Sequence, residues 1–272
     1  MHKFEIYTNT TKDPERSFEK EVVDFLTSQG AECVTCEKEG FTPECCIVLG
    51  GDGTVLRAAE GARRSQIPIL GINLGTVGYL AETEKSRWKE ALMQLLQDNY
   101  SVEDRMMLDG YLENCREGCH HALNDIVIGR SGALHIMNYD VYVGGTLLNT
   151  YRADGIIVCT PTGSTAYNLS AGGPIVEPGA EMIVLTPICP HQIGIRSIVV
   201  AASSVIEIVI GPIRRDENLR DGGQGAEAHF DGNERVELQS GDRFVIRRSQ
   251  EVTRLVKLEN RSFLETLHCK LS

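Results

Sequence analysis

The chain has 272 residues, of which 42% are hydrophobic and 24% charged, a balance typical of a folded globular protein rather than a disordered one. Its 27 Lys and Arg residues against 38 Asp and Glu residues give a net charge of −11, which argues against general binding to the backbone of a nucleic acid. A small anionic ligand is not excluded, because a metal ion and local backbone N–H groups can offset the net field.

The sequence contains no run of 18 apolar residues, and residues 1–30 soon turn charged without an apolar core typical of a signal peptide. We therefore expect a cytoplasmic protein with no membrane partner. Because the cytoplasm is reducing, we interpret the nine cysteines as small hydrophobic residues rather than as disulfide partners. Two groups could suggest zinc, Cys33, Cys36, Cys45 and Cys46 and also Cys115, Cys119, His120 and His121, but in each we favour the interpretation without metal.

The N-terminal third alternates between strand and helix patterns. Between residues 14 and 29, for example, Phe18, Val22, Phe25 and Leu26 fall on one helical face, and Gly30 ends the pattern. We predict strands over residues 3–7, 31–36, 44–49 and 67–72, and helices over residues 14–29, 55–64 and 83–98. Strands separated by helices of this length predict a Rossmann-like open α/β sheet.

The pattern changes near Ser101, after which short strands and turns dominate. Gly144 and Gly145 are spaced as the turn of a hairpin. We predict strands over residues 106–112, 122–129, 135–143, 146–152, 155–159, 182–186, 204–210 and 243–248, and a mobile surface loop over residues 212–226. The sequence thus predicts an α/β domain over residues 1–100, an all-β domain over residues 101–258, and a tail, residues 259–272, that returns to the first domain.

The first candidate functional motif is Gly50-Gly51-Asp52-Gly53-Thr54, which lies between a predicted strand and a predicted helix. Such a turn can direct backbone N–H groups at a phosphate, and glycines let the ligand approach closely. It is neither a Walker A loop nor a dinucleotide fingerprint. Because a carboxylate repels phosphate, Asp52 needs another role, such as accepting a hydroxyl proton or holding a metal. The alternative is a tight turn in which Asp52 caps the next helix.

Two further motifs are weaker. Residues 71–80 place three glycines after a predicted strand, which indicates a second close approach of chain or ligand, or else a plain strand-to-helix connection. Asn124 and Asp125 precede an apolar strand. Their side chains can read a base or a ribose edge, although an ordinary turn would explain them as well.

The longest motif runs from Arg152 to Pro174, where an apolar strand enters a turn rich in Thr, Ser and Gly. The helix start that follows offers hydroxyls and free N–H groups to a ligand, and Tyr167 could stack on a base. Ser164 lacks the Gly-x-Ser-x-Gly surroundings of a hydrolase nucleophile. The alternative is a capped helix with a buried tyrosine.

Together these motifs resemble the NAD kinases, which form part of a superfamily with diacylglycerol kinases and 6-phosphofructokinases. The resemblance rests on Gly50–Thr54, on Asn124-Asp125, and on residues 160–167 with Gly172-Gly173-Pro174. It implies an α/β domain and a β-rich domain, the substrates NAD and ATP, a divalent ion such as Mg²⁺, and a homodimer or homotetramer. The implied reaction moves a phosphoryl group from ATP to the 2′-hydroxyl of the adenosine ribose of NAD.

The resemblance also assigns roles to individual residues. Asp52 is the implied general base, and Gly50, Gly51, Gly53 and Thr54 form the implied phosphate loop. The positions implied to contact NAD are Asp52, Gly53, Asn124, Asp125, His135, Arg152, Asp154, Thr165, Ala166, Tyr167, Ser170, Cys189 and Asn233. Asp154 would face the nicotinamide side or the ligand of a neighbouring subunit. Many relatives carry Gln or another residue where Asn233 stands, which weakens the ligand role implied for it.

Two alternatives remain beside the NAD kinase interpretation. A lipid or sphingoid kinase of the same superfamily would carry the same Gly-Gly-Asp-Gly-Thr loop, but the sequence lacks a basic or apolar membrane-facing segment. A non-catalytic NAD-binding regulator would not need an acidic residue inside its phosphate loop. Donor identity, ATP or polyphosphate, and preference for NAD or NADH are not determined by these motifs.

Overall fold

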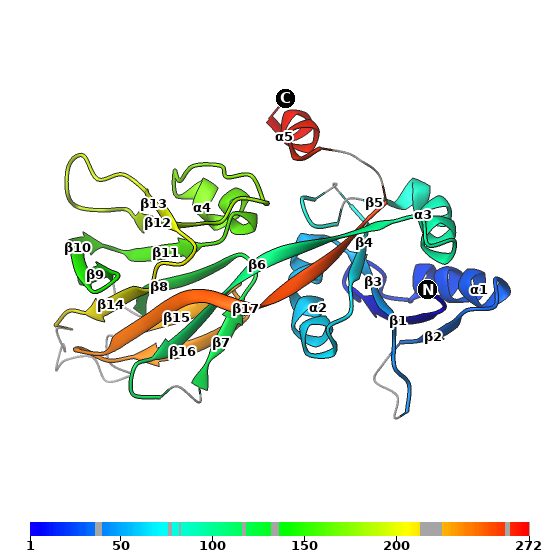
Figure 1. Ribbon diagram of the computed structural model, residues 1–272, viewed down its shortest axis with the longest axis horizontal. Helices are drawn as coiled ribbons and strands as arrows, with labels where there is room; N and C mark the ends of the chain where they lie inside the picture. Colours follow the sequence, from blue (N-terminus) through cyan, green and yellow to red (C-terminus); the bar gives the residue numbers. More distant parts are fainter. Residues whose placement is uncertain are drawn as a thin grey trace. The chain divides into compact units, whose positions relative to one another are not determined.

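The computed structural model describes residues 1–35, 40–75, 78–81, 83–115, 118–131, 136–212, 225–258 and 262–271. The chain divides into two compact units (Figure 1). Unit 1 consists of Met1–Arg105 together with Val252–Ser272, and unit 2 consists of Met106–Glu251. None of the helices in the described ranges is long and apolar enough to cross a membrane.

Unit 1 is built on a parallel sheet with the strand order β2-β1-β3-β4. These strands are β1 (Lys3–Thr8), β2 (Glu32–Val34), β3 (Cys45–Gly50) and β4 (Ile69–Asn73). The short β5 (Thr83–Glu84) and the last part of β17 (Arg243–Lys257) also pair with β4. Every residue of β3 and β4 is buried. This explains their unbroken apolar runs, since a parallel strand covered on both faces needs no polar side.

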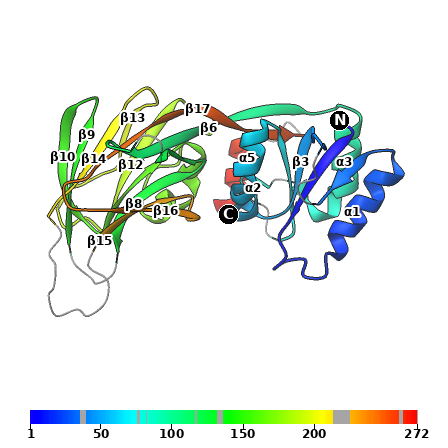
Figure 2. The ribbon, with the colours of Figure 1, turned by 90° about the horizontal axis from the view of Figure 1, so that it is seen from below.

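Helices cover both faces of this sheet. Figure 2 shows α1 (Ser17–Ser28) and α3 (Trp88–Leu96) on one face and α2 (Asp52–Ser65) on the other. The rings of Phe18 and Phe25 meet Trp88 edge-on at centroid distances of 5.5 and 5.3 Å, which joins α1 to α3. A 3-10 turn (Lys85–Arg87) precedes α3, and the chain ends in α5 (Phe263–Leu271).

Unit 2 contains two antiparallel layers that share one hydrophobic core. In one layer the order is β10-β9-β14-β17, with β6 pairing β17 and β7; in the other it is β13-β12-β11-β8-β15-β16. The strands are β6 (Ser101–Leu112), β7 (His120–Ala122), β8 (Asp125–Ser131), β9 (Met137–Val143), β10 (Thr146–Ala153), β11 (Gly155–Cys159), β12 (Met182–Ile188), β13 (Ile198–Ala201), β14 (Ile206–Ile210), β15 (Gly225–Phe230) and β16 (Glu234–Leu238). Alternating residues of both layers, such as Tyr139 and Ile128, point into the core.

The predicted fold class, an α/β domain followed by an all-β domain, is confirmed. The hairpin at Gly144 and Gly145 is also confirmed, with φ values of 57° and 76° that glycine adopts without strain. Several predicted boundaries are wrong. Helix α2 begins at Asp52 rather than at Val55, so the motif itself forms the first helical turn.

Other differences lie toward the C-terminus. Strands β13, β15 and β16 and helix α5 were not predicted. Strand β17 runs nine residues beyond the predicted end at Arg248. The predicted loop over residues 212–226 lies mostly outside the described residues, but Gly225 and Ala226 already belong to β15. His135 lies outside the described residues.

Candidate active site

The Gly50–Thr54 motif connects β3 to α2 at the carboxyl edge of the parallel sheet. The Thr54 hydroxyl accepts hydrogen bonds from the Gly51 N–H at 3.3 Å and from the Asn9 side-chain amide at 3.0 Å. A Cβ atom on Gly50 would lie 2.3 Å from the Thr54 hydroxyl oxygen, so only glycine fits there. The turn is therefore closed by its own threonine, and Gly53 is left exposed at the start of the helix.

Asp52 is held by a loop that follows β4. Its Oδ2 accepts the N–H of Tyr79 at 2.8 Å, and its Oδ1 accepts the N–H groups of Leu80 and Ala81, both at 3.0 Å. The interpretation of Asp52 as the cap of its own helix is therefore wrong, because the carboxylate faces another segment and Gly51 occupies the cap position. A carboxylate offers about four acceptor positions, so one position on Oδ2 has no donor among the described residues. Asp52 is partly exposed.

The second glycine-rich stretch, residues 71–80, explains how three backbone N–H groups reach the Asp52 carboxylate. A Cβ atom on Gly78 would lie 1.7 Å from the Asp52 Oδ1, and one on Gly71 would lie 2.8 Å from the Cα of Ala81. Both glycines let the loop approach the carboxylate. The residue types of this stretch give only a weak signal of function. The three N–H donors to Asp52 cannot be predicted from them, because any residue type except proline carries a backbone N–H group.

Helix α5 packs against the same loop. The Tyr79 ring lies 6.2 Å from the Phe263 ring, centroid to centroid, and the Lys270 ammonium lies 4.8 Å from the Tyr79 centroid. These contacts fix the side chain of a residue whose N–H holds Asp52. The C-terminal helix thus supports the candidate general base indirectly.

In unit 2, Asn124 and Asp125 are held by a second carboxylate. Asp231 accepts the N–H groups of Leu123, Asn124 and Asp125 at 2.8, 2.8 and 3.0 Å. Burial, and then the charge of Asp231, raises the pKa of Asp125 to about 7. Burial also raises the pKa of Asp231, against the lowering effect of the three N–H groups. Asp231, with φ at 49°, was not predicted as part of the site.

The long motif packs directly onto Asn124. The Thr160 hydroxyl donates to the Leu123 carbonyl at 2.6 Å, and the Thr160 N–H donates to the Asn124 carbonyl at 2.9 Å. A Cβ atom on Gly163 would lie 2.1 Å from that same Asn124 carbonyl oxygen. The turn after β11 and the start of β8 therefore form one rigid arrangement in which glycine at position 163 is required.

Inside this turn, Ser164 and Asn168 act as internal ties. Ser164 bonds to Pro161 and Val176, while the Asn168 amide donates to the Ser164 and Pro174 carbonyls at 3.0 and 2.9 Å. Asn168 also accepts the Thr186 hydroxyl at 2.6 Å. Both side chains are fully buried and bonded, so Ser164 is a structural residue.

The predicted ligand residues of this turn are less buried than Ser164 and Asn168. Helix α4 (Tyr167–Ser170) has only four residues, Tyr167 is 47% exposed and Ser170 is exposed. The alternative of a buried tyrosine is therefore wrong. Thr165 and Ala166 are partly exposed beside it. A surface of small and aromatic side chains on a rigid base is suited to binding a planar ring.

Three other predicted residues lie at the opposite end of β11. The Arg130 guanidinium donates to the Asp154 carboxylate at 3.3 Å, Arg152 is exposed, and Cys189 is exposed with φ at 45°. The five residues of β11 separate this group from Thr160 by roughly 15–20 Å. Asn233, in the turn after Asp231, belongs to the Asn124 end. The structure thus sorts the described candidates into one group in unit 1 and two groups in unit 2.

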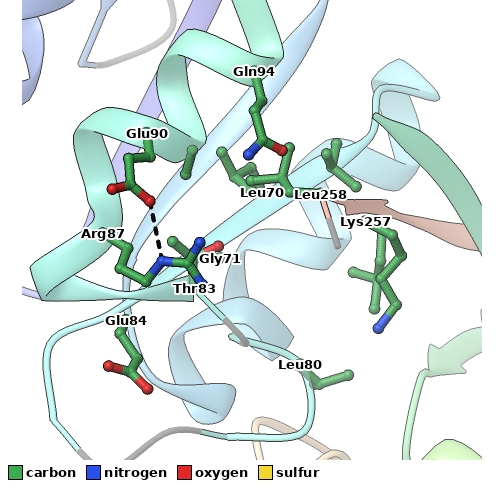
Figure 3. Close-up of a pocket in the computed structure, with 13 residues that line it drawn as sticks. Leu70, Gly71, Leu80, Thr83, Glu84, Arg87, Glu90, Gln94, Lys257 and Leu258 are labelled. Atoms are coloured by element: carbon green, nitrogen blue, oxygen red, sulfur yellow. Dashed lines mark hydrogen bonds and ion pairs between the residues drawn. The ribbon is translucent and has the colours of Figure 1, made fainter. Parts of the chain in front are cut away.

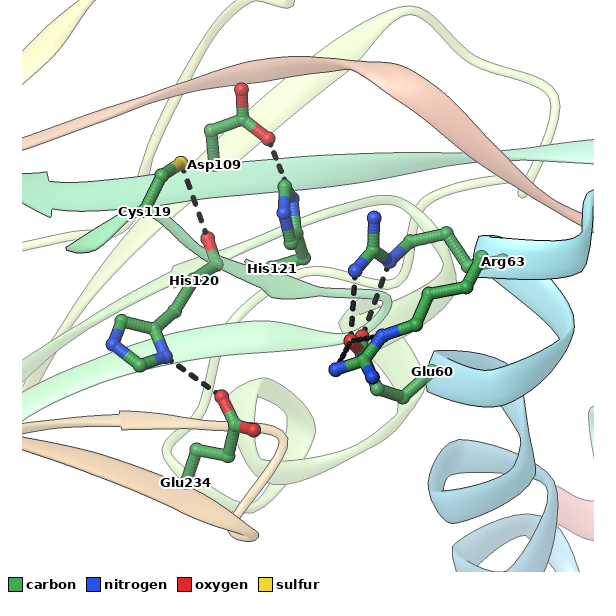
Figure 4. Close-up of polar contacts among 8 residues, drawn as sticks. Glu60, Arg63, Asp109, Cys119, His120, His121 and Glu234 are labelled. Carbon is green, nitrogen blue, oxygen red and sulfur yellow. Dashed lines mark hydrogen bonds and ion pairs between the residues drawn. The ribbon is translucent and has the colours of Figure 1, made fainter. Parts of the chain in front are cut away.

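A cluster of metal-ligand type also lies in unit 2. Asp109, Cys119 and His121 bring their ligand atoms within 4.8 Å of one another (Figure 4). The Asp109 carboxylate, however, already bonds to His121 at 2.9 Å and lies 3.5 Å from the Arg247 guanidinium. Burial would raise the pKa of Asp109, but hydrogen bonds from His121 and Ser249 hold it below its ordinary value. His120 faces Glu234 instead.

Unit 1 also contains a cavity of about 70 Å³ between α3, β4 and the end of β17 (Figure 3). Its lining combines apolar side chains such as Leu70 and Leu258 with Arg87, Glu90 and Gln94. The loop that holds Asp52 reaches this cavity through Leu80. Among the residues that the structure describes, none of the predicted site residues lines this cavity.

Comparison with known proteins identifies the family. Residues 5–100 match the family model "ATP-NAD kinase N-terminal domain", and residues 123–258 match "ATP-NAD kinase C-terminal domain". The chain is 44% identical to an NAD kinase of Lachnospira eligens, over 100% of both chains, and 41% identical to one of Lachnoclostridium phytofermentans, over 99% of both.

Solved structures share the fold. An NAD kinase from Archaeoglobus fulgidus in complex with ATP superposes with a TM-score of 0.80 at 26% identity and covers 98% of each chain. Yeast NADH kinase complexed with NADH gives a TM-score of 0.80 at 23% identity, over 100% of this chain and 87% of that one. With both halves matched and close relatives aligned over the whole length, this chain belongs to the NAD kinase family.

Proposed function

We propose that this chain transfers the γ-phosphoryl group of ATP to the 2′-hydroxyl of the adenosine ribose of NAD, which yields NADP and ADP. The observation that carries the proposal is the orientation of Asp52, whose carboxylate is fixed by three backbone N–H groups with one acceptor position open on Oδ2. An acidic group inside a phosphate-binding turn is explained if it accepts a hydroxyl proton.

In the proposed step Asp52 is the general base. The ribose 2′-oxygen attacks the γ-phosphorus while its proton passes to Oδ2 of Asp52, and the bond between the γ-phosphorus and the β,γ-bridging oxygen breaks with its electron pair leaving on ADP. Because phosphoryl transfer involves little covalent chemistry on the protein, positioning and charge neutralisation supply most of the remaining acceleration. Gly50, Gly51, Gly53 and Thr54 present the backbone of the turn to the phosphates.

Recognition of NAD is proposed for unit 2. Asn124 and Asp125 offer an amide and a carboxylate to the adenine or ribose, on a segment fixed by Asp231. The exposed surface beside them would form the adenine pocket, which comprises Thr165, Ala166, Tyr167 and Ser170. Asn233 lies in the turn next to this end.

The other group of unit 2 is assigned to a different part of the ligand. Arg152, Asp154 and Cys189 lie too far along β11 to share the adenine pocket, which supports a role toward the nicotinamide side or the ligand of a neighbouring subunit. His135 is proposed as a further contact by family resemblance. A homodimer or homotetramer, which this assignment needs, is part of the proposal.

The divalent ion is proposed to be Mg²⁺ and to arrive with ATP as part of the substrate. Mg²⁺ usually binds through one or two carboxylates together with substrate phosphates. The described phosphate turn contributes a single carboxylate, Asp52, that is already bonded to three N–H groups. The cluster of Asp109, Cys119 and His121 offers sulfur and nitrogen donors, which suit Mg²⁺ poorly.

Two rival functions are less well supported. A lipid or sphingoid kinase of the diacylglycerol kinase and phosphofructokinase superfamily would need a membrane-binding surface, whereas this chain is acidic, with a net charge of −11. A non-catalytic NAD-binding regulator would have no use for a carboxylate with an open acceptor position in the phosphate turn. We further propose a cytoplasmic enzyme of NADP biosynthesis.

The experiment is formation of NADP by the purified chain from NAD, ATP and Mg²⁺, followed with an NADP-specific dehydrogenase. A parallel reaction with inorganic polyphosphate tests the donor, and one with NADH tests the acceptor. Turnover with NAD and ATP supports the proposal. Binding of NAD without turnover by any donor would favour the regulator, and binding to anionic vesicles with phosphorylation of a lipid would favour the lipid kinase.

A further inference from the structure

We propose that Lys12 binds the phosphate chain of ATP in the active site. The inference rests on the proposed function, because it names the side chain that receives the triphosphate of the phosphoryl donor. Lys12 lies in the turn between β1 and α1, outside each of the four motifs that suggested the function.

The position of the Lys12 ammonium is defined by two glycines. Its Nζ lies 3.2 Å from the point where a Cβ atom of Gly51 would stand, and also 3.2 Å from the corresponding point on Gly75. Gly51 follows β3 and Gly75 follows β4, which are adjacent parallel strands. The ammonium therefore lies between the two glycine-rich loops, at the carboxyl edge of the sheet where open α/β proteins bind their ligands.

The turn that carries Lys12 is well ordered by hydrogen bonds. The side-chain oxygen of Asn9 accepts the N–H of Thr11 at 3.0 Å and of Lys12 at 3.3 Å, while its amide donates to Thr54 of the phosphate turn. Asn9 thus ties the Lys12 turn to the Gly50–Thr54 motif. A lysine whose backbone is fixed in this way loses less freedom when it engages a phosphate.

Asp13 fixes the other side of the same turn. Its buried carboxylate accepts the N–H groups of Phe18 and Glu19 at 3.1 and 3.0 Å, and so closes the first turn of α1. Burial would raise the pKa of Asp13, but these hydrogen bonds lower it below its ordinary value, so the group is held as an anion. Asp13 is engaged with α1 and leaves the neighbouring ammonium to other partners.

The positive charge of the Lys12 ammonium can offset the negative charge around the phosphate turn. The phosphate turn carries the negative charge of Asp52, which opposes the approach of a triphosphate, and the chain as a whole is acidic. Among the residues that the structure describes, Lys12 forms no ion pair within 4.0 Å. An exposed cation without a carboxylate partner, placed against two glycines beside a phosphate-type turn, is suited to a charge-assisted bond to a phosphate oxygen.

The test uses the full chain and the non-hydrolysable analogue AMP-PNP with Mg²⁺. Lys12→Met keeps most of the aliphatic stem and removes the charge. We expect the Kd of Mg-AMP-PNP and the KM for ATP to rise about 10- to 100-fold, the range for loss of a hydrogen bond between charged groups. The Kd of NAD should change less than twofold. Lys12→Arg, which keeps the charge, should recover part of the affinity.

Lys20→Met is the matched control, because Lys20 is an exposed lysine of α1 and has no atom among those within 4 Å of the points where Cβ atoms of Gly51 and Gly75 would stand. It should bind AMP-PNP and NAD like the unmodified chain. Melting temperatures of all variants exclude a general loss of fold.

Unchanged binding of AMP-PNP by Lys12→Met would overturn the proposal, as would equal weakening of AMP-PNP and NAD, which would indicate a structural role for the lysine. Failure of the proposed function would look different. In that case the unmodified chain would form no NADP, while the AMP-PNP measurement would still decide whether Lys12 binds phosphate.

Discussion

Two carboxylates, one in each unit, accept three successive backbone N–H groups. Asp52 is held by Tyr79, Leu80 and Ala81, and Asp231 is held by Leu123, Asn124 and Asp125. The bonding is nearly the same, but the surroundings differ. Asp52 opens helix α2, and its hydrogen-bond donors among the described residues are three backbone N–H groups, whereas Asp231 stands next to a second carboxyl group, that of Asp125.

This difference in surroundings indicates a catalytic role for Asp52 and a structural role for Asp231. A carboxylate that is oriented by three donors, is partly exposed and has one acceptor position open can receive a proton from a substrate. Asp231 is oriented in the same way but fixes the backbone of a neighbouring acid, Asp125, whose pKa is raised by burial and then by the charge of Asp231. We therefore expect that substitution of Asp52 mainly affects rate, and substitution of Asp231 mainly affects stability.

The largest effect is expected for Asp52→Asn. The amide cannot accept the ribose proton, so kcat should fall on the order of 10²- to 10⁴-fold. The Kd of NAD and the melting temperature should change little, because the amide oxygen still accepts from the Leu80 and Ala81 N–H groups. Steady-state assays of NADP formation, with NAD titration and thermal unfolding alongside, provide the check. A variant with nearly unchanged kcat would show that Asp52 is not the base.

Asp231→Asn tests the structural role of the second carboxylate. Asparagine tolerates the left-handed φ of 49°, but its amide can accept from only some of the three N–H groups and turns a donor toward the rest. We expect a loss of about 1–3 kcal/mol in the free energy of unfolding. Urea unfolding followed by fluorescence measures it. A large loss of kcat at unchanged stability would mean that the two carboxylates do not differ in the way described.

A smaller, pH-dependent effect is expected from Asp125. Its pKa of about 7 in the folded state lies above that of the unfolded chain, so the folded state binds the extra proton. The contribution of Asp125 to stability is present below the unfolded pKa, near 4, and is lost as the pH rises toward 7. The same ionisation creates the carboxylate proposed to bind NAD.

The affinity for NAD should therefore rise several-fold between pH 6 and pH 8, as expected when a group with a pKa near 7 must ionise for binding. Calorimetric titration of NAD across this range measures it, and Asp125→Asn is the control, since its lower affinity should be independent of pH. The same pH dependence in both chains would assign the effect to another group.

The smallest effect is expected from Phe263→Ala in α5. Loss of the contact with Tyr79 removes support from the loop that holds Asp52, and an aromatic pair contributes about 0.5–1.5 kcal/mol, so kcat should fall about 2- to 10-fold. Leu264→Ala in the same helix is the control, because Leu264 is 68% exposed. If both substitutions have the same effect on kcat, the Tyr79 contact does not support the base.

Much of the fold could be predicted because it depends on local patterns. The fully buried strand β3 follows from the run Cys45–Gly50, and the hairpin follows from Gly144 and Gly145. Boundaries were less predictable. Helix α2 starts at Asp52 because the Thr54 hydroxyl closes the turn, and β17 extends to Lys257 because its end pairs with β4 through Leu255. Neither cause is visible in residue periodicity.

The candidate site also has features that the sequence predicts and features that depend on the tertiary structure. By itself the sequence determined which residue types are present, including an acid in a glycine-rich turn and an Asn-Asp pair before a strand, and these identify the family. Only the tertiary structure decided what holds them: the N–H groups of residues 79–81 for Asp52, Asp231 for Asp125, and the spacing between Thr160 and Asp154 along β11. The physical reason is that backbone donors come from any residue type, and contacts between distant segments depend on how the sheets pack.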